Sequence, residues 1–361
     1  MIKLLIVDDS ALMRRQLTSI FQDAGGFEIR IARNGREAVE ENRTFAPDVI
    51  TLDINMPEMD GLTALSLLMA ERPVPVVMVS SLTEKGALAT LEALNLGAVD
   101  YIPKPGGTIS LSIVEIESEM INKVRAAARA RLKTARNLTA RLRSDTLTKP
   151  VVKPPSAPAS RPLLQRGGIR NEGVVLIGVS TGGPRTLEDI LPLLPADFAW
   201  PVLVAQHMPP SFTRPFAERM NALCPLTVSE LSRPTPLEAG NIYIAKGGAD
   251  MVLARRTNKL TALARPENAE FLWHPSVELL GRSALEHCDP VNVIAVLLTG
   301  MGYDGAQAFT DLKRQGARTI AESEETAIVF GMPAELIARG GATLTLPAER
   351  IALQLQNWVE R

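Results

Sequence analysis

The first 122 residues alternate short apolar runs of strand character with amphipathic helical stretches. Strands are predicted at Lys3–Val7, Glu28–Ala32, Val49–Leu52 and Val76–Val79 and around Tyr101, and helices at Ala11–Ala24, Arg36–Arg43, Thr63–Ala70 and Lys85–Leu96. Repeated βα units constrain a chain strongly, because they fold into an open parallel sheet with helices on both faces. We therefore expect an α/β fold, a flavodoxin-like, doubly wound domain whose site lies at the carboxyl ends of the strands.

Polar residues follow these strands at the points where each one ends. Asp8 and Asp9 follow the first strand, Asp53 the third, Ser80 the fourth and Lys104 the fifth. Three carboxylates at one sheet edge repel one another and need a cation, and hard oxygen ligands suit Mg²⁺. A carboxylate can accept a phosphoryl group when metal, hydroxyl and ammonium groups stabilise the transferring oxygens.

The stretches VDDS, LDINMPEMDG, VMVSS and YIPKP resemble the receiver domains of two-component response regulators, over residues 1–122. The resemblance makes Asp53 the phospho-acceptor. It implies these Mg²⁺ ligands: Asp8, Asp9, Asp53 and the main-chain carbonyl of Asn55. It also implies that Ser80 and Lys104 contact the phosphoryl group and that Tyr101 occupies the aromatic switch position. The implied phosphodonor is a histidine kinase.

A second apolar run, Val174–Ile177, leads into Gly178-Val179-Ser180-Thr181-Gly182 and then a helical pattern over Thr186–Leu194. This pattern predicts a strand, a tight turn and a helix, with Ser180 at the turn. Gly-x-Ser-x-Gly is the pattern of a nucleophile elbow. Taken alone, the same residues fit a glycine-rich phosphate-binding turn or an ordinary βα connection equally well.

Two later strands supply partners for this serine. The run Val202–Ala205 ends just before His207, and Val293–Leu298 ends just before the glycine-rich loop that holds Asp304. Neighbouring parallel strands lie about 4.8 Å apart, so side chains at their carboxyl ends can meet. A histidine can take the proton of a serine, and an aspartate can orient that imidazole.

Backbone amides near Thr181 and Met301 are candidates for an oxyanion hole. The chain order Ser–His–Asp differs from the order in α/β-hydrolases. The other two histidines, His274 and His287, are expected to be surface or packing residues.

The second half of the chain resembles the CheB family of chemotaxis response regulators in IGVSTGGP, QHMPPSFTRPFAERMN, IYIAKGGADM, LLTGMGYDGA and VFGMP. The resemblance implies a Rossmann-like α/β methylesterase domain with a mainly parallel sheet over residues 171–361. It carries the nucleophile to Ser180, the base to His207, the third triad member to Asp304, and the oxyanion donors to the amides of Thr181 and Met301.

The implied reaction is hydrolysis of glutamate γ-methyl esters, with deamidation of glutamines, on the cytoplasmic helices of methyl-accepting chemoreceptors. The implied phosphodonor is a CheA-type histidine kinase, and no cofactor is expected in the esterase site. The sequence departs from the family pattern at Lys246, where proline is common, and at Trp273–Glu278, which reads WHPSVE where HRPSVD is usual. These departures leave the triad intact but bear on substrate preference and on the charge of the cleft.

Composition limits the remaining possibilities. Apolar residues make up 46% of the chain and charged residues 22%, and the net charge of −1 argues against bulk nucleic-acid binding. No apolar run approaches the roughly 18 residues of a membrane span, so no membrane insertion is expected. Cys224 and Cys288 form no disulfide framework, which suits a reducing cytoplasm. We expect a cytoplasmic, monomeric protein.

Residues 123–170 are expected to form a basic, proline-rich linker with a helical lead-in. They contain thirteen Lys or Arg residues and one acid, Asp145. The segment can be a solubilising tether or a docking strip for an acidic partner.

Two other kinds of output domain could follow a receiver domain. A DNA-binding output is disfavoured, because the second half alternates strands and helices and lacks a compact helix-turn-helix ending. A nucleotide-binding output is disfavoured because GVSTGG lacks the GxGxxG spacing and His207, not an acid, follows the next strand.

Overall fold

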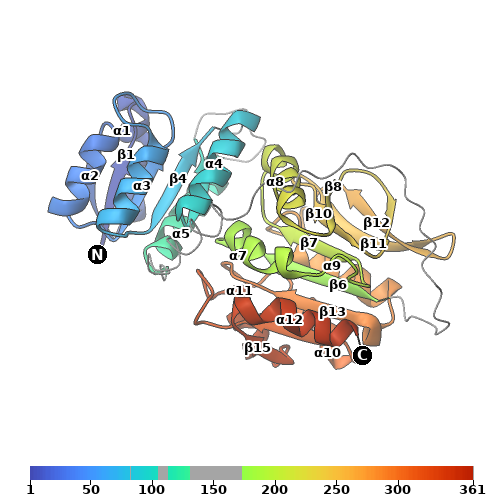
Figure 1. Ribbon diagram of the computed structural model, residues 1–361. Helices are drawn as coiled ribbons and strands as arrows, with labels where there is room; N and C mark the ends of the chain where they lie inside the picture. Colours follow the sequence, from blue (N-terminus) through green and yellow to red (C-terminus); the bar gives the residue numbers. More distant parts are fainter. Residues whose placement is uncertain (82, 105–112, 131–172, 361) are drawn as a thin grey trace.

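The computed structural model describes residues 1–81, 83–104, 113–130 and 173–360. These residues form two α/β units, an N-terminal unit over 1–130 and a C-terminal unit over 173–360 (Figure 1). The expected linker lies almost entirely outside the described residues. Its predicted helical lead-in begins as the end of a helix, α5 (Ile113–Ala127), that continues past residue 122.

The N-terminal unit is a five-stranded parallel sheet in the order β2-β1-β3-β4-β5. Its strands are β1 (Ile2–Val7), β2 (Phe27–Ala32), β3 (Val49–Asp53), β4 (Val76–Ser80) and β5 (Asp100–Pro103). Its first four helices are α1 (Ala11–Ala24), α2 (Gly35–Thr44), α3 (Gly61–Glu71) and α4 (Glu84–Leu96). This strand order is the flavodoxin-like doubly wound order, as the sequence predicts.

Polar side chains fix the starts of these four helices. Ser10, Asn34, Asp60 and Thr83 each accept a hydrogen bond from a backbone N–H in the first helical turn. Each cap directly follows the connection from a strand, so the helix begins close to the carboxyl edge of the sheet. The caps therefore help to set the loops that carry the polar residues of this edge.

The C-terminal unit contains a seven-stranded, entirely parallel sheet in the order β15-β14-β13-β6-β7-β10-β8. Its strands are β6 (Val174–Val179), β7 (Val202–Gln206), β8 (Thr227–Leu231), β10 (Asn241–Ala245), β13 (Val293–Leu297), β14 (Arg318–Glu322) and β15 (Leu344–Leu346). The helices around it are α7 (Gly183–Ile190), α8 (Pro210–Leu223), α9 (Val277–His287), α10 (Ala306–Arg314), α11 (Met332–Ala338) and α12 (Ala348–Val359). The α/β fold with a mainly parallel sheet is confirmed.

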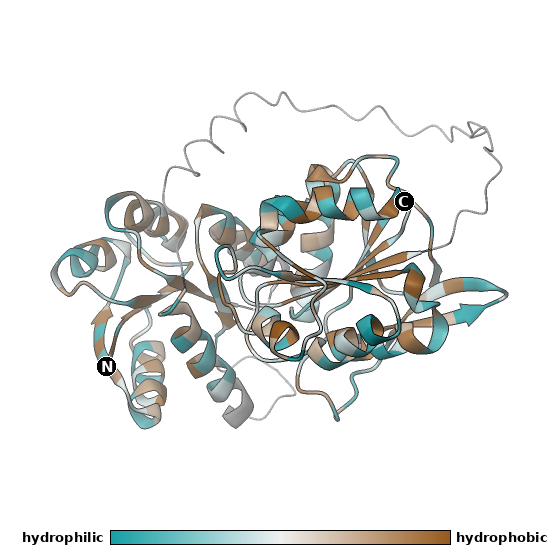
Figure 2. Ribbon diagram, turned by 90° about the horizontal axis from the view of Figure 1, so that it is seen from below, coloured by the Kyte–Doolittle hydropathy of each residue, from teal (hydrophilic) through white to brown (hydrophobic). Residues whose placement is uncertain are grey.

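Every residue of the three central strands β6, β7 and β13 is buried, as expected for strands covered on both faces. Figure 2 shows the same pattern, with brown strands inside and teal residues on the outer helices. A separate three-stranded antiparallel sheet has the order β11 (Asp250–Arg256), β12 (Lys259–Arg265) and β9 (Thr235–Pro236). Helix α9 packs on β11, so this small sheet borders the carboxyl edge of the main one.

The two units are in contact. Helix α4 of the N-terminal unit packs against α8 and α7 of the C-terminal unit (Figure 1). The elements on this side of the C-terminal unit are those that follow β6 and β7. The contact therefore lies close to the loops that carry Ser180 and His207.

Candidate active site

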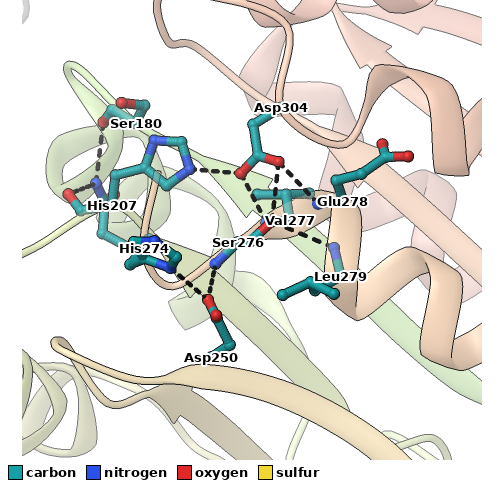
Figure 3. A network of polar contacts seen from close by, with 10 residues as sticks. Ser180, His207, Asp250, His274, Ser276, Val277, Glu278, Leu279 and Asp304 are labelled. Atoms are coloured by element: carbon teal, nitrogen blue, oxygen red, sulfur yellow. Dashed lines mark hydrogen bonds and ion pairs between the residues drawn. The ribbon is translucent and has the colours of Figure 1, made fainter. Parts of the chain in front are cut away.

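Three polar residues lie at the carboxyl edge of the seven-stranded sheet. Ser180 follows β6, and β6 lies between β7, which precedes His207, and β13, whose following loop carries Asp304. The Nε2 atom of His207 lies 2.8 Å from Oδ2 of Asp304 (Figure 3). The predicted arrangement of the three strands is thus present, with the strand of the serine in the middle.

Glycines shape the turn around Ser180. Gly182 has a φ of +78°, a backbone conformation that residues other than glycine rarely adopt. A Cβ atom at Gly183 would lie 2.0 Å from Oε1 of Gln206. The amide of that glutamine donates to the carbonyls of Ser180 (3.1 Å) and His207 (3.0 Å), which ties the ends of β6 and β7 together. The close packing explains why only glycine fits beside the serine.

The carboxylate of Asp304 sits at the N-terminus of α9. The backbone N–H groups of Val277 (2.7 Å) and Glu278 (2.9 Å) donate to it, and the hydroxyl of Ser276 donates at 3.2 Å. Burial acts to raise the pKa of Asp304, but the hydrogen bond and charge interaction with His207, with these backbone bonds, outweigh burial and lower the pKa. Asp304 is therefore held as a carboxylate that can support a charged imidazole.

The two ring nitrogens of His207 have different surroundings. Nε2 faces Asp304, while Nδ1 is buried and has no hydrogen-bond partner within the described part of the chain. A histidine that donates from Nε2 to an aspartate carries its free lone pair on Nδ1. In this site, Nδ1 is the nitrogen available to accept a proton.

The loops that carry Thr181 and Met301 are held side by side by Thr299. The hydroxyl of Thr299 donates to the carbonyl of Thr181 (2.9 Å), and its own carbonyl accepts from the N–H of Ser180 (2.9 Å). The N–H of Thr299 in turn donates to the buried carboxylate of Glu322 (2.8 Å). The two segments predicted to supply oxyanion donors are thus adjacent to Ser180.

A second cluster of polar residues lies at the carboxyl edge of the five-stranded sheet. Asp8, Asp9 and Asp53 each place a carboxylate oxygen within 4.8 Å of the others. The ammonium of Lys104 lies 2.8 Å from Oδ2 of Asp53 and 3.3 Å from Oδ2 of Asp8. Apart from this ammonium, neither oxygen has a polar partner within the described ranges, and both are buried. Burial is the main cause that raises the pKa of Asp53, and Lys104 partly opposes it.

The other residues predicted for this site are distributed around it. Ser80 ends β4, next to β3, and its hydroxyl donates to main-chain carbonyls of the following segment. Asn55 lies two residues beyond Asp53 and is exposed. Tyr101 faces the other unit instead, where its ring stacks on Phe212 of α8 with centroids 4.5 Å apart and planes 4° from parallel.

A buried polar contact joins the two units beside that aromatic pair. The hydroxyl of Thr181 donates to Oδ2 of Asp100 at 2.7 Å. Lys123 lies 3.5 Å from Oδ1 of the same carboxylate and 5.0 Å from the centre of the Tyr101 ring. Burial, followed by the charge of Asp100, raises the pKa of Tyr101 well above its ordinary value. The residue next to the candidate nucleophile is thus bonded directly to the N-terminal unit.

Asp250 and its hydrogen-bond partners hold the segment that leads into α9, and they are not among the site residues predicted from the sequence. Asp250 is 1% exposed and accepts hydrogen bonds from His274 (2.9 Å) and from the N–H of Ser276 (2.7 Å) (Figure 3). Of the two roles expected for His274, surface or packing, its 16% exposed side chain and its bond to Asp250 fit the second. The unusual stretch Trp273–Glu278 is the signal in the sequence that marks this region, although nothing in it indicates Asp250.

Comparisons with known proteins find matches for both units of the chain. The family model of the CheB methylesterase matches residues 175–355, and that of the response regulator receiver domain matches residues 4–113. A protein-glutamate methylesterase/protein-glutamine glutaminase of Rhodospirillum rubrum is 57% identical over all of this chain and 97% of its own length. A second protein of that name, from Rhodopseudomonas palustris, is 50% identical over 99% of this chain and 98% of its own.

The crystal structure of the CheB methylesterase catalytic domain of Thermotoga maritima aligns with a TM-score of 0.50 and 38% identity. The alignment covers 52% of this chain and 98% of the Thermotoga maritima domain. Together, the two family matches and the full-length relatives show that this chain belongs to the CheB methylesterase family, as an ester hydrolase that carries a response regulator receiver domain.

Proposed function

We propose that the protein hydrolyses glutamate γ-methyl esters on other proteins, with Ser180 as the nucleophile. The observation that carries this proposal is the His207–Asp304 pair, 2.8 Å long, at the sheet edge where Ser180 follows the neighbouring strand. A serine hydroxyl becomes a competent nucleophile when an oriented histidine accepts its proton.

In the proposed mechanism, Oγ of Ser180 attacks the ester carbonyl while Nδ1 of His207 takes the hydroxyl proton. Asp304 stabilises the resulting imidazolium through Nε2. Methanol leaves with the proton returned by His207, and a water activated by the same nitrogen then hydrolyses the acyl-enzyme. The backbone amides of Thr181 and Met301 are the proposed donors to the negatively charged oxygen of each tetrahedral intermediate.

Release of methanol from methylated receptor membranes tests the esterase directly. We expect the wild-type protein to release methanol and Ser180→Ala to release none, while Ser211→Ala, at the half-buried start of α8, keeps wild-type activity. Equal release by wild type and Ser180→Ala would overturn the assignment of the nucleophile.

Deamidation of glutamine is the same reaction with a poorer leaving group, and we propose it as a second activity. Mass spectrometry of a glutamine-bearing receptor fragment detects the conversion of amide to acid. An unchanged fragment, under conditions in which the ester is cleaved, would exclude deamidation.

We propose that Asp53 is the phospho-acceptor and that a CheA-type histidine kinase is the donor. Asp8, Asp9 and Asp53, with the main-chain carbonyl of Asn55, would hold Mg²⁺. The buried oxygens of Asp8 and Asp53, whose polar neighbour is the Lys104 ammonium, fit a hard cation. When bound, Mg²⁺ would neutralise negative charge on the phosphoryl oxygens. Lys104 and the hydroxyl of Ser80 are the proposed protein contacts to the same group.

We propose further that the N-terminal unit restrains the esterase until Asp53 is phosphorylated. Two contacts support this: the hydrogen bond from Thr181 to Asp100 and the stack of Tyr101 on Phe212. Thr181 is the neighbour of Ser180, and Tyr101 lies on the strand that precedes Lys104. A change at the phosphorylation site can thus reach the esterase loop through β5.

The substrates we propose are methyl-accepting chemoreceptors, whose demethylation gives sensory adaptation in chemotaxis. The proposed domains are a receiver over 1–122, a linker over 123–170 and a catalytic domain over 171–361. No helix among the described residues is both long and apolar enough to span a bilayer. The free, buried Cys224 and the free Cys288 favour a reducing compartment, and we propose the cytoplasm.

A further inference from the structure

We propose that Trp273 is a positioning residue of the esterase. Its indole holds the imidazole of His207 in the orientation that presents Nδ1, and it favours the charged imidazolium formed when Nδ1 accepts a proton. This inference rests on the proposed serine-esterase function. It assigns a role to the first residue of the stretch WHPSVE, whose later residues Ser276, Val277 and Glu278 donate hydrogen bonds to Asp304.

The imidazole of His207 needs a second restraint. Its one hydrogen bond within the described ranges runs from Nε2 to Asp304, and Nδ1 has no partner there. A ring held only by its covalent bond to Cβ and by one hydrogen bond can still tilt about the line that joins these two points and move its other nitrogen out of line. An efficient base requires a fixed orientation, so a neighbouring group has to hold the plane of the ring.

Trp273 is placed to do this. Its ring lies 6.1 Å from the His207 ring, centre to centre, with the planes 4° from parallel. Offset parallel rings at this separation are a favourable aromatic pair. The indole also meets the ring of Tyr303 edge-on, with centres 5.0 Å apart and planes 86° apart.

The loop after β13 leaves room for the indole. Gly302 has a φ of +87°, and a Cβ at this position would lie 2.7 Å from Cζ2 of Trp273. A side chain here would therefore displace the indole as well as strain the backbone. The tryptophan is thus confined between His207 and the Gly302–Tyr303 segment, which directly precedes Asp304.

Asp250 fixes the segment that carries Trp273 at both ends. Its Oδ2 accepts from the N–H of Asn268 (3.0 Å), and its Oδ1 accepts from Nδ1 of His274 (2.9 Å) and from the N–H of Ser276 (2.7 Å). One buried carboxylate therefore closes the loop from 268 to 276 onto the edge of β11. Figure 3 shows His274 and Ser276 converging on Asp250 beneath the His207–Asp304 pair.

The chemistry of the cycle gives this contact an effect on rate. His207 alternates between imidazole and imidazolium during the reaction. An aromatic face attracts a neighbouring cation, which changes the equilibrium constant for protonation of His207 by about two- to fivefold. The attraction exists only in the charged form, so it favours proton transfer from Ser180. Because Trp273 acts through His207, its removal should lower kcat and leave KM nearly unchanged.

The experiment uses the full-length protein with a small-molecule phosphodonor and Mg²⁺, and measures methanol release as a function of pH. The variants are Trp273→Leu, Trp273→Phe and, as a matched neighbour, Leu272→Ala. Leu272 is 75% exposed, and its truncation should leave kcat unchanged. Asp304, Asp250 and His274, the charged and titratable side chains of the network around His207, are the same in every variant, so their contributions cancel in the comparison.

We expect Trp273→Leu to lower kcat about two- to fivefold at unchanged KM. Trp273→Phe keeps an aromatic ring, and its kcat should be close to that of wild type. The acid limb of the kcat profile should move to lower pH in Trp273→Leu, because the imidazolium is less favoured and the base stays neutral further into acid. An unmoved acid limb, or a change confined to KM, would overturn the proposal. Activity retained in Ser180→Ala would instead refute the esterase mechanism itself.

Discussion

Thr181→Val tests the restraint between the two units, since it removes one hydroxyl at nearly constant volume. The Thr181 hydroxyl donates to the buried carboxylate of Asp100 at 2.7 Å. A hydrogen bond to a charged group contributes about 1.5–3 kcal/mol. Each 1.4 kcal/mol is about a tenfold change in an equilibrium constant, so the closed arrangement should lose about ten- to hundredfold of its population advantage.

The prediction concerns activity without phosphodonor. We expect Thr181→Val to release methanol faster than wild type in the unphosphorylated state, towards the rate of a fragment that begins at residue 171. Thr181→Ser keeps the hydroxyl and should behave as wild type. With saturating phosphodonor, wild type and Thr181→Val should converge, because the contact is then already broken.

Two results would refute this reasoning. Basal activity of Thr181→Val equal to that of wild type, with equal phosphorylated activity, would show that the hydrogen bond does not restrain the esterase. A fragment no more active than the unphosphorylated full-length protein would reject restraint by the N-terminal unit altogether.

Other changes have equally definite outcomes. Asp53→Asn should abolish the stimulation of methanol release by phosphodonor and leave basal release unchanged, since its side chain cannot form the acyl phosphate. Asp304→Ala should lower kcat by about a thousandfold or more, because His207 loses its orienting partner. The lowered pKa of Asp304 means that its contribution to stability is full at neutral pH and is lost as pH falls through the folded-state value, so Asp304→Asn should flatten the acid side of a pH–stability curve from chemical unfolding. Burial raises the pKa of the Cys224 thiol to about 12 and that of the Cys288 thiol to about 11, which leaves little thiolate at pH 8. Labelling of the native protein by iodoacetamide should therefore be slow at pH 8, and its rate should increase only at a higher pH than the rate for a free thiol does.

The sequence predicts the positions of Ser180, His207 and Asp304 because each follows a strongly apolar strand. Parallel strands end at one edge, and the hydrophobic runs mark those ends within a residue or two: the run predicted at Val293–Leu298 is observed as Val293–Leu297. Helix α7 shows where such reasoning weakens. The predicted helix to Leu194 ends at Ile190 and continues as a short 3₁₀ turn, because Pro192 has no N–H to donate to the carbonyl of Glu188.

Contacts between distant segments were beyond sequence reasoning. Asp250 lies at the end of the stretch IYIAKGGADM, but nothing in that stretch indicates its partners, and its bond to His274 depends on how α9 packs over β11. The bond from Thr181 to Asp100 depends on the docking of two separately folded units. Neither periodicity nor residue type specifies such docking, and each is set by the fit of whole surfaces.

The central place of β6 in the seven-stranded sheet has a consequence for refolding. The nucleophile and the base come from β6 and β7, which are close in sequence, but the acid arrives only when β13 pairs with the opposite edge of β6. His207 and Asp304 are 97 residues apart, and closing so long a loop is slow compared with forming helices. Recovery of esterase activity should therefore lag behind recovery of helical signal, which makes catalysis a reporter of the long-range pairing of β13 with β6.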